Sequence, residues 1–242
     1  MHPLFYYLFG FMLVGGVGMW AGSRKAAVTV RRQRWLKYFM YILITNIIIA
    51  SIFYHFFNWV ILIIILAGFA ELAVVSNKII ARHAGMAYLA FFIYAVVASG
   101  SWLFAKQFVS NVQLFFYFQV FIFDAFCQVT GQIAGKRKLA PAVSPAKTIE
   151  GFIGGLLFCI LAALIGSIWV ALPLIQAALY GLITGLTSLC GDLLASYYKR
   201  QTGVKDYSNW LPGQGGFLDR FDSLLMTTSV YYFLHLAGLL SL

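Results

Sequence analysis

Long apolar stretches alternate with short polar segments along the whole chain. A transmembrane helix needs about 20 mostly apolar residues to cross the hydrocarbon core of a bilayer, so each long stretch predicts one span. A tight turn near 55–58 divides one overlong run, and Pro173 marks a helix start because proline is tolerated in a first turn. Eight spans are expected: 3–21, 38–55, 58–76, 86–104, 112–133, 150–170, 172–195 and 222–241. The pattern predicts an all-α polytopic integral membrane protein with one domain over residues 1–242.

Basic residues are distributed unevenly between the two sides of this predicted bundle. The chain has 17 Lys and Arg residues against 7 Asp and Glu residues, a net charge of +10. All the bases except Lys106 fall in alternate segments, 22–37, 77–85, 134–149 and 196–221. Because Lys and Arg concentrate in cytoplasmic loops, these segments are expected in the cytoplasm and both termini on the other side of an inner (cytoplasmic) membrane. Bases placed between spans indicate anionic membrane lipids as partners and argue against nucleic acid.

A polar cluster between residues 191 and 222 interrupts the apolar pattern. It holds four of the seven acids, Asp192, Asp206, Asp219 and Asp222, together with the bases Lys199, Arg200, Lys205 and Arg220. Asp192, Ser196 and Lys199 are spaced to share one helix face, as are Asp219 and Asp222. Paired carboxylates suit a hard divalent cation that also binds phosphate. Between them, the glycine-rich segment 212–216 lets backbone N–H groups approach an anion closely.

These residues resemble the phosphatidate cytidylyltransferase (CDP-diglyceride synthase) family. The family pattern is S-x-x-K-R, four residues, K-D, and then P-G-H-G-G-x-x-D-R-x-D. The matching positions are Ser196, Lys199, Arg200, Lys205, Asp206, Pro212, Gly213, Gly215, Gly216, Asp219, Arg220 and Asp222, with every spacing kept. A second matching stretch runs from Asp124 to Gly151. One position departs from the pattern, because the family's His is Gln214 in this chain.

The resemblance implies a reaction at the cytoplasmic membrane surface. CTP and phosphatidate, or a related lipid phosphate, would give CDP-diacylglycerol and pyrophosphate with the help of Mg²⁺, and a second cation is left open. The expected metal ligands are Asp192, Asp219 and Asp222, and Lys199 completes the catalytic set. The expected substrate-binding residues are Asp124, Lys138, Ser144, Lys147, Ser196, Arg200, Lys205, Gln214, Gly215, Gly216 and Arg220.

Several alternatives stay open from the sequence. Gln214 can donate a hydrogen bond but cannot carry a proton or a charge as His can, so the chain could be an altered homologue that uses another lipid phosphate. A CTP-dependent lipid kinase of the polyprenol or phytol type is a further candidate, as is a transporter or a non-catalytic scaffold. Glu71, inside a span, fits either support of the site or a helix-packing ion pair. Segment 22–37 fits an interfacial stretch that lies on anionic headgroups or a plain loop that stops transfer. A homodimer is neither required nor excluded.

Overall fold

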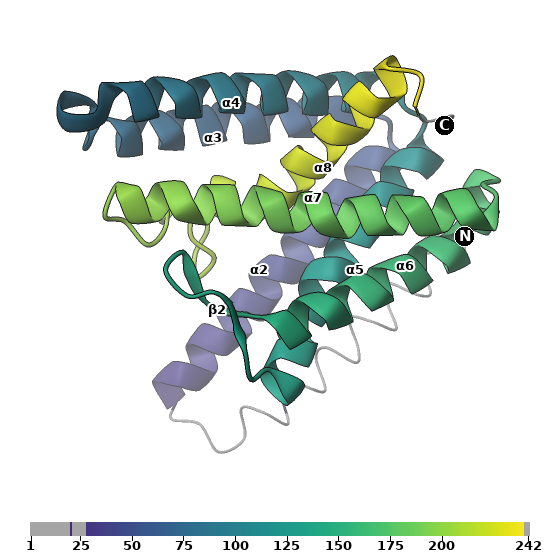
Figure 1. Ribbon diagram of the computed structural model, residues 1–242, viewed down its shortest axis with the longest axis horizontal. Coiled ribbons are helices and arrows are strands. Elements are labelled where there is room, and N and C mark those ends of the chain that lie inside the picture. The colour runs from purple at the N-terminus through teal and green to yellow at the C-terminus, as the bar shows by residue number, and fades with distance from the viewer. Residues whose placement is uncertain (1–19, 21–27, 240–242) are drawn as a thin grey trace.

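The computed structural model describes residue 20 and residues 28–239, which form a bundle of helices with one small hairpin (Figure 1). The helices in this part of the chain are α2 (Val28–Phe53), α3 (Phe57–Ser76), α4 (Ile80–Gln107), α5 (Ser110–Ala134), α6 (Ile149–Val170), α7 (Leu174–Gln201) and α8 (Leu218–Leu236). Strands β1 (Lys138–Ala140) and β2 (Ser144–Thr148) pair antiparallel between α5 and α6. The all-α class is confirmed, with this hairpin as a small addition.

Six of the described helices, α2 to α7, are long and apolar enough to cross a membrane. They correspond to the predicted spans from 38–55 to 172–195, and both inferred boundaries hold. The chain turns at His55, which has a φ of 61°, and α7 begins directly after Pro173. Apart from residue 20, the predicted span 3–21 lies outside the described residues. The predicted count of eight is therefore not confirmed.

The predicted last span corresponds to α8, which is not among the six helices with the composition of a span. Its first turns carry Asp219, Arg220 and Asp222, and it is rich in Ser, Thr and Tyr. Many of these polar side chains are buried and bond to neighbouring helices. Thr227 meets Ser188 of α7 at 3.1 Å, and Thr228 donates to Ser101 of α4 at 3.1 Å. Polar side chains can hold helices together inside a membrane, so α8 is a central helix with few lipid-facing apolar positions.

The basic segments 77–85, 134–149 and 196–221 gather at one end of the bundle, on the left in Figure 1. The turns after α2, α4 and α6 lie at the other end. This arrangement agrees with the predicted alternation of the spans. Residues 28–37 of the basic segment 22–37 form the first turns of α2, so this part of the segment is not a plain loop.

Small residues let the helices near the site approach closely. A Cβ atom on Gly191 of α7 would lie 2.7 Å from the backbone oxygen of Asp222 in α8. On α6, a Cβ atom on Gly151 would lie 2.7 Å from the backbone oxygen of Cys127 in α5. Close helix contacts of this kind bring α5, α6, α7 and α8 together behind the polar cluster.

Candidate active site

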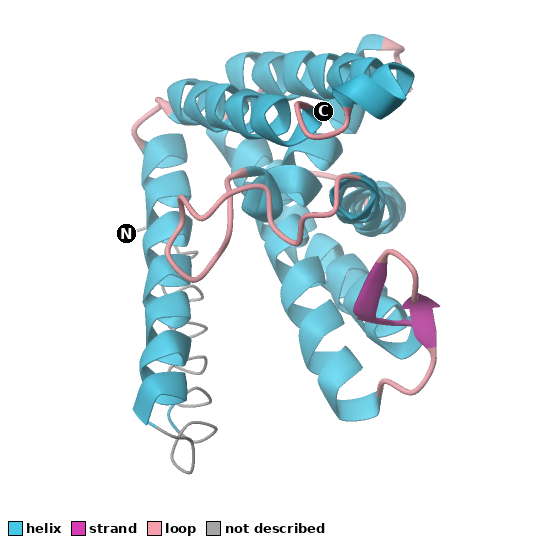
Figure 2. Cartoon of the chain, turned by 90° about the vertical axis from the view of Figure 1, so that its left-hand side faces the viewer, coloured by secondary structure: helices cyan, strands magenta, loops and turns pink. Residues whose placement is uncertain are grey.

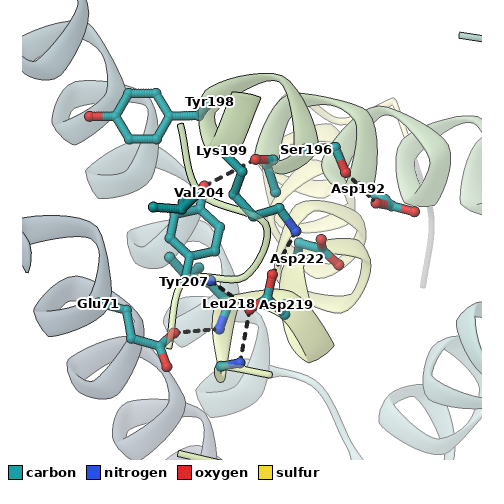
Figure 3. A network of polar contacts seen from close by, with 12 residues as sticks. Glu71, Asp192, Ser196, Tyr198, Lys199, Val204, Tyr207, Leu218, Asp219 and Asp222 are labelled. Atoms are coloured by element: carbon teal, nitrogen blue, oxygen red, sulfur yellow. Dashed lines mark hydrogen bonds and ion pairs between the residues drawn. The ribbon is translucent and has the colours of Figure 1, made fainter. Parts of the chain in front are cut away.

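Asp192 is the centre of a contact group where α7 meets the β-hairpin. Ser196, one turn further along α7, donates its hydroxyl to one carboxylate oxygen at 3.1 Å (Figure 3). The ammonium group of Lys147, in β2, forms an ion pair with the other oxygen. Burial alone would lower the pKa of Lys147, but the Asp192 carboxylate outweighs it and raises the pKa above its usual value. Lys147 therefore stays a cation at the edge of the site.

Lys199 and Asp219 form a second, more deeply buried group. The Lys199 ammonium lies 2.6 Å from one oxygen of Asp219, and both residues are buried. The other oxygen of Asp219 accepts hydrogen bonds from the backbone N–H groups of Tyr207 and Gly216, each at 2.8 Å. Both oxygens of Asp219 are thus engaged by the protein. This carboxylate ties α7, the loop 202–217 and the start of α8 to one another.

The other two carboxylates of the region are less engaged. Asp222 accepts one hydrogen bond, from the backbone N–H of Ser223 at 2.7 Å. Asp124 of α5 is exposed, although it lies within a predicted span. The charges of Asp124 and Asp192 act on Asp222, and Lys199 partly offsets them. The charges of Asp192 in α7 and Asp222 in α8 therefore act on each other, and Asp222 has one hydrogen-bond partner.

Glu71 of α3 fixes the loop and α8 from the opposite side. Its carboxylate accepts hydrogen bonds from the backbone N–H groups of Phe217 and Leu218, both at 2.9 Å, and from the Ser208 hydroxyl at 2.5 Å. The first N–H groups of a helix have no partner within the helix, so an acid placed there stabilises its start. Of the two roles left open from the sequence, Glu71 has the supporting one. A side chain at Gly216 would collide with this carboxylate, which explains a glycine at that position.

The predicted binding residues outside this centre are more dispersed. Lys138, Lys205 and Arg220 are exposed, and Ser144 begins β2. The Arg200 guanidinium donates to the backbone oxygen of Val143 at 3.1 Å, which links α7 to the hairpin turn. The hairpin and the loop 202–217, which carry Lys138, Ser144 and Lys205, lie at the same end of the bundle (Figure 1).

Gln214 has a partner far away in the sequence. Its side-chain amide donates to the backbone oxygen of Lys37 in α2 at 2.7 Å. The flanking residues Gly213 and Gly215 have φ values of 73° and 87°, which favour glycine. The loop therefore crosses from α7 towards α2 and is held there by Gln214 (Figure 2).

A family model described as "Cytidylyltransferase family" matches residues 3–237. The chain belongs to the cytidylyltransferase family. Among its curated relatives is a phosphatidate cytidylyltransferase of Aquifex aeolicus, 39% identical over 137 residues, which are 55% of this chain and 50% of the relative. The enzyme of the same name from Bacillus subtilis is 43% identical over 113 residues, 46% of this chain and 42% of the relative. An Escherichia coli protein, "Uncharacterized protein YnbB", is 46% identical over 104 residues, 43% of this chain and 35% of the relative. The matched regions thus span about half or less of these relatives' length.

The carboxylates of this cytidylyltransferase-family site differ in how well they fit a metal ion. Among the described residues, no three His, Cys, Asp or Glu side chains gather closely enough to hold a metal alone, so the predicted trio Asp192, Asp219 and Asp222 does not form one ligand group. Mg²⁺ usually takes one or two carboxylates and completes its shell with water and substrate phosphates. Asp222 meets that requirement with a single backbone partner, and Asp192 meets it with one side-chain partner on each oxygen. Asp219 fits less well, because it is buried and already has three partners.

The sequence did not single out two residues that shape the site. Tyr207 donates its N–H to Asp219, and its ring lies 5.5 Å from the Lys199 ammonium. Burial raises the pKa of the Tyr207 phenol, and the nearby charges of Asp222 and Asp219 raise it further, so it stays neutral. Ser208 bonds to Glu71. Both residues lie within the family motif, at positions that its pattern leaves unspecified.

Proposed function

We propose that this protein transfers the cytidylyl group of CTP to the phosphate of phosphatidate, or of a related lipid phosphate, at the membrane surface. The observation that carries the proposal is the grouping of Lys147, Asp192, Ser196, Lys199 and Asp222 at one end of a membrane bundle. Membership of the cytidylyltransferase family and the names of the Aquifex aeolicus and Bacillus subtilis relatives support the same reaction. The end with the basic loops would face the cytoplasm, where CTP is found.

The chemistry asks for positioning and charge neutralisation. An oxygen of the lipid phosphate forms a bond to the α-phosphorus of CTP, and the bond from that phosphorus to the oxygen bridging to the β-phosphorus breaks. Pyrophosphate leaves with its negative charge. Because the attacking phosphate is already an anion near neutral pH, no general base is needed. The protein mainly has to hold the lipid phosphate, the α-phosphate of CTP and the leaving pyrophosphate in line while it neutralises their charge.

The residues have separate roles in this proposal. Asp192 and Asp222 would hold Mg²⁺, which supplies charge neutralisation to the nucleotide phosphates when bound. Lys147, Lys138 and Ser144 would contact phosphate from the hairpin side. Arg200, Lys205 and Arg220 would attract the triphosphate and the departing pyrophosphate. Lys199 would keep Asp219 and the loop in place, so that the backbone at Gly215 and Gly216 faces the nucleotide.

The decisive experiment is product analysis with purified protein, labelled CTP, Mg²⁺ and phosphatidate. We expect CDP-diacylglycerol and pyrophosphate in equal amounts, with no product after chelation of Mg²⁺ or in Asp222→Asn. Release of CDP with a phosphorylated alcohol would instead identify a lipid kinase. Absence of product with phosphatidate, but turnover with another lipid phosphate, would identify the altered homologue considered from the sequence.

A further inference from the structure

A cleft of about 230 Å³ opens between α3, α4, α7 and α8, beside the site. Three tyrosines in its wall have their hydroxyls engaged by the protein. Tyr94 donates to the backbone oxygen of Ile65 at 2.6 Å, the Tyr198 hydroxyl lies 2.6 Å from that of Ser76, and Tyr207 donates to the backbone oxygen of Ala195 at 3.2 Å. These rings therefore offer mainly carbon surface to the cleft.

The mouth of the cleft faces the side of the bundle. Leu89 and Ile93 of α4 are 57% and 38% exposed, and Leu194 and Tyr197 of α7 are 42% and 47% exposed. Helices α4 and α7 each pack extensively against α8, but not against each other. Since both helices have the length and composition of membrane spans, the gap between them opens into the acyl region of a bilayer.

The inner end of the cleft reaches the site. Among the described residues that line it, Asp222 is the one carboxylate, and Gly191 packs against the Asp222 backbone. The cleft thus joins a carboxylate of the candidate active site to the hydrocarbon region. A second cavity of about 210 Å³, between α5 and α6, is lined by no acidic residue from the part of the chain that the structure describes.

We propose that the cleft between α4 and α7 binds an acyl chain of the lipid substrate, which enters sideways from the bilayer. This inference rests on the proposed function, because the lipid phosphate must lie near Asp222 while its chains stay in an apolar medium. The volume is below the roughly 300–1,000 Å³ of pockets that enclose a whole small ligand, so the cleft would hold part of one chain. A chain that leaves lipid for an apolar cleft gains little from the hydrophobic effect, so its main contribution is positioning.

Photolabelling tests the cleft without requiring turnover. Phosphatidate that carries a diazirine in one acyl chain is incubated with the full-length protein in vesicles, irradiated, and the labelled peptides are mapped. We expect labels on α4 and α7 near Ile93 and Leu194, displaced by unlabelled phosphatidate. Phosphatidylcholine with the same modified chain should label these positions weakly and without such competition. Equal labelling by both lipids, with no competition, would show ordinary surrounding lipid and overturn the proposal.

A pair of variants tests the role of the cleft in the reaction. Ala195→Phe and Ala90→Phe fill it from opposite walls, and Ala162→Phe makes the same change in the second cavity. We expect both cleft variants to lower kcat/KM for long-chain phosphatidate by roughly tenfold or more, and to leave the KM for CTP unchanged. Activity on a soluble short-chain phosphatidate, and all activities of Ala162→Phe, should stay within about twofold.

The outcomes separate the two proposals. Equal losses on long and short chains in both cleft variants would mean that the site itself is distorted, and would contradict the acyl-chain role. If the protein converts no lipid phosphate at all, the proposed function fails. The photolabelling result would still decide whether the cleft selects phosphatidate.

Discussion

Asp219 and Asp222 lie three residues apart on α8, but their oxygens have different surroundings. Asp219 is buried, paired with Lys199 and bonded to two backbone N–H groups. Asp222 has one backbone partner and two neighbouring carboxylates, Asp192 and Asp124. The contacts of Asp219 stabilise the folded protein. The charge of Asp222 is repelled by the neighbouring carboxylates, which destabilises the folded protein until a cation binds. We therefore expect their substitutions to have different effects.

Asp222→Asn should abolish cytidylyltransferase activity while thermal stability is unchanged or increased, because a repulsive charge is removed. Asp219→Asn should lower stability as well, since breaking a buried ion pair leaves Lys199 unpaired and costs about 3–5 kcal/mol. Thermal unfolding in detergent, measured beside initial rates, checks both. Equal loss of stability in the two variants would contradict the separate roles.

Gln214 makes its contact with α2, which suggests that it positions the loop. Gln214→His should keep activity within about tenfold, a change of roughly 1.4 kcal/mol in the barrier. Gln214→Ala should lose more, because the Lys37 carbonyl loses its donor without replacement. Initial rates on phosphatidate are measured against pH. A large gain with His that depends on pH between about 5.5 and 7.5, near the pKa of imidazole, would instead indicate a lost acid or cation.

At the level of elements, the site depends on how the loop 202–217 and the start of α8 are anchored. Glu71 reaches them from α3 and Asp219 from within, and together they satisfy the backbone N–H groups of residues 207 and 216–218. The hairpin is fixed separately, by Lys147 on Asp192 and by Arg200 on the Val143 backbone. The two segments that we propose to bind phosphate therefore meet on α7.

Glu71→Gln keeps the size of the side chain but removes its charge. It also replaces one accepting oxygen by an NH2 group, which donates hydrogen bonds and cannot accept from the backbone N–H groups. A hydrogen bond to a charged group contributes about 1.5–3 kcal/mol, so this variant should unfold at lower temperature and its loop should be cut faster by protease. Asp206→Asn, a change at an exposed acid of the same loop, is the matched control and should behave as the parent. Unchanged protease sensitivity in Glu71→Gln would mean that α8 is held mainly by its helix contacts.

At the scale of the whole molecule, the hairpin and the loop 202–217 lie at the same end of the bundle. Single cysteines at positions 140 and 205, in a background without the native thiols, should react with an impermeant reagent from one side of the membrane only. A cysteine at position 109, in the turn after α4, should react from the other side. Labelling of 140 and 205 from opposite sides would contradict this arrangement.

The sequence alone determined the membrane class and six of the helices, and it predicted the residues of the candidate site. Those features depend on local hydrophobicity and on motif spacing, which can be read along the chain. Only the tertiary structure decided that Asp219 pairs with Lys199 and two backbone N–H groups, that Glu71 anchors α8 and that Gln214 bonds to Lys37. Each of these roles depends on a partner from a distant segment, and an aspartate has the same chemistry in the sequence whether or not its oxygens are already occupied. The same holds for α8, because its polar side chains are matched across helix contacts that spacing within one helix cannot reveal.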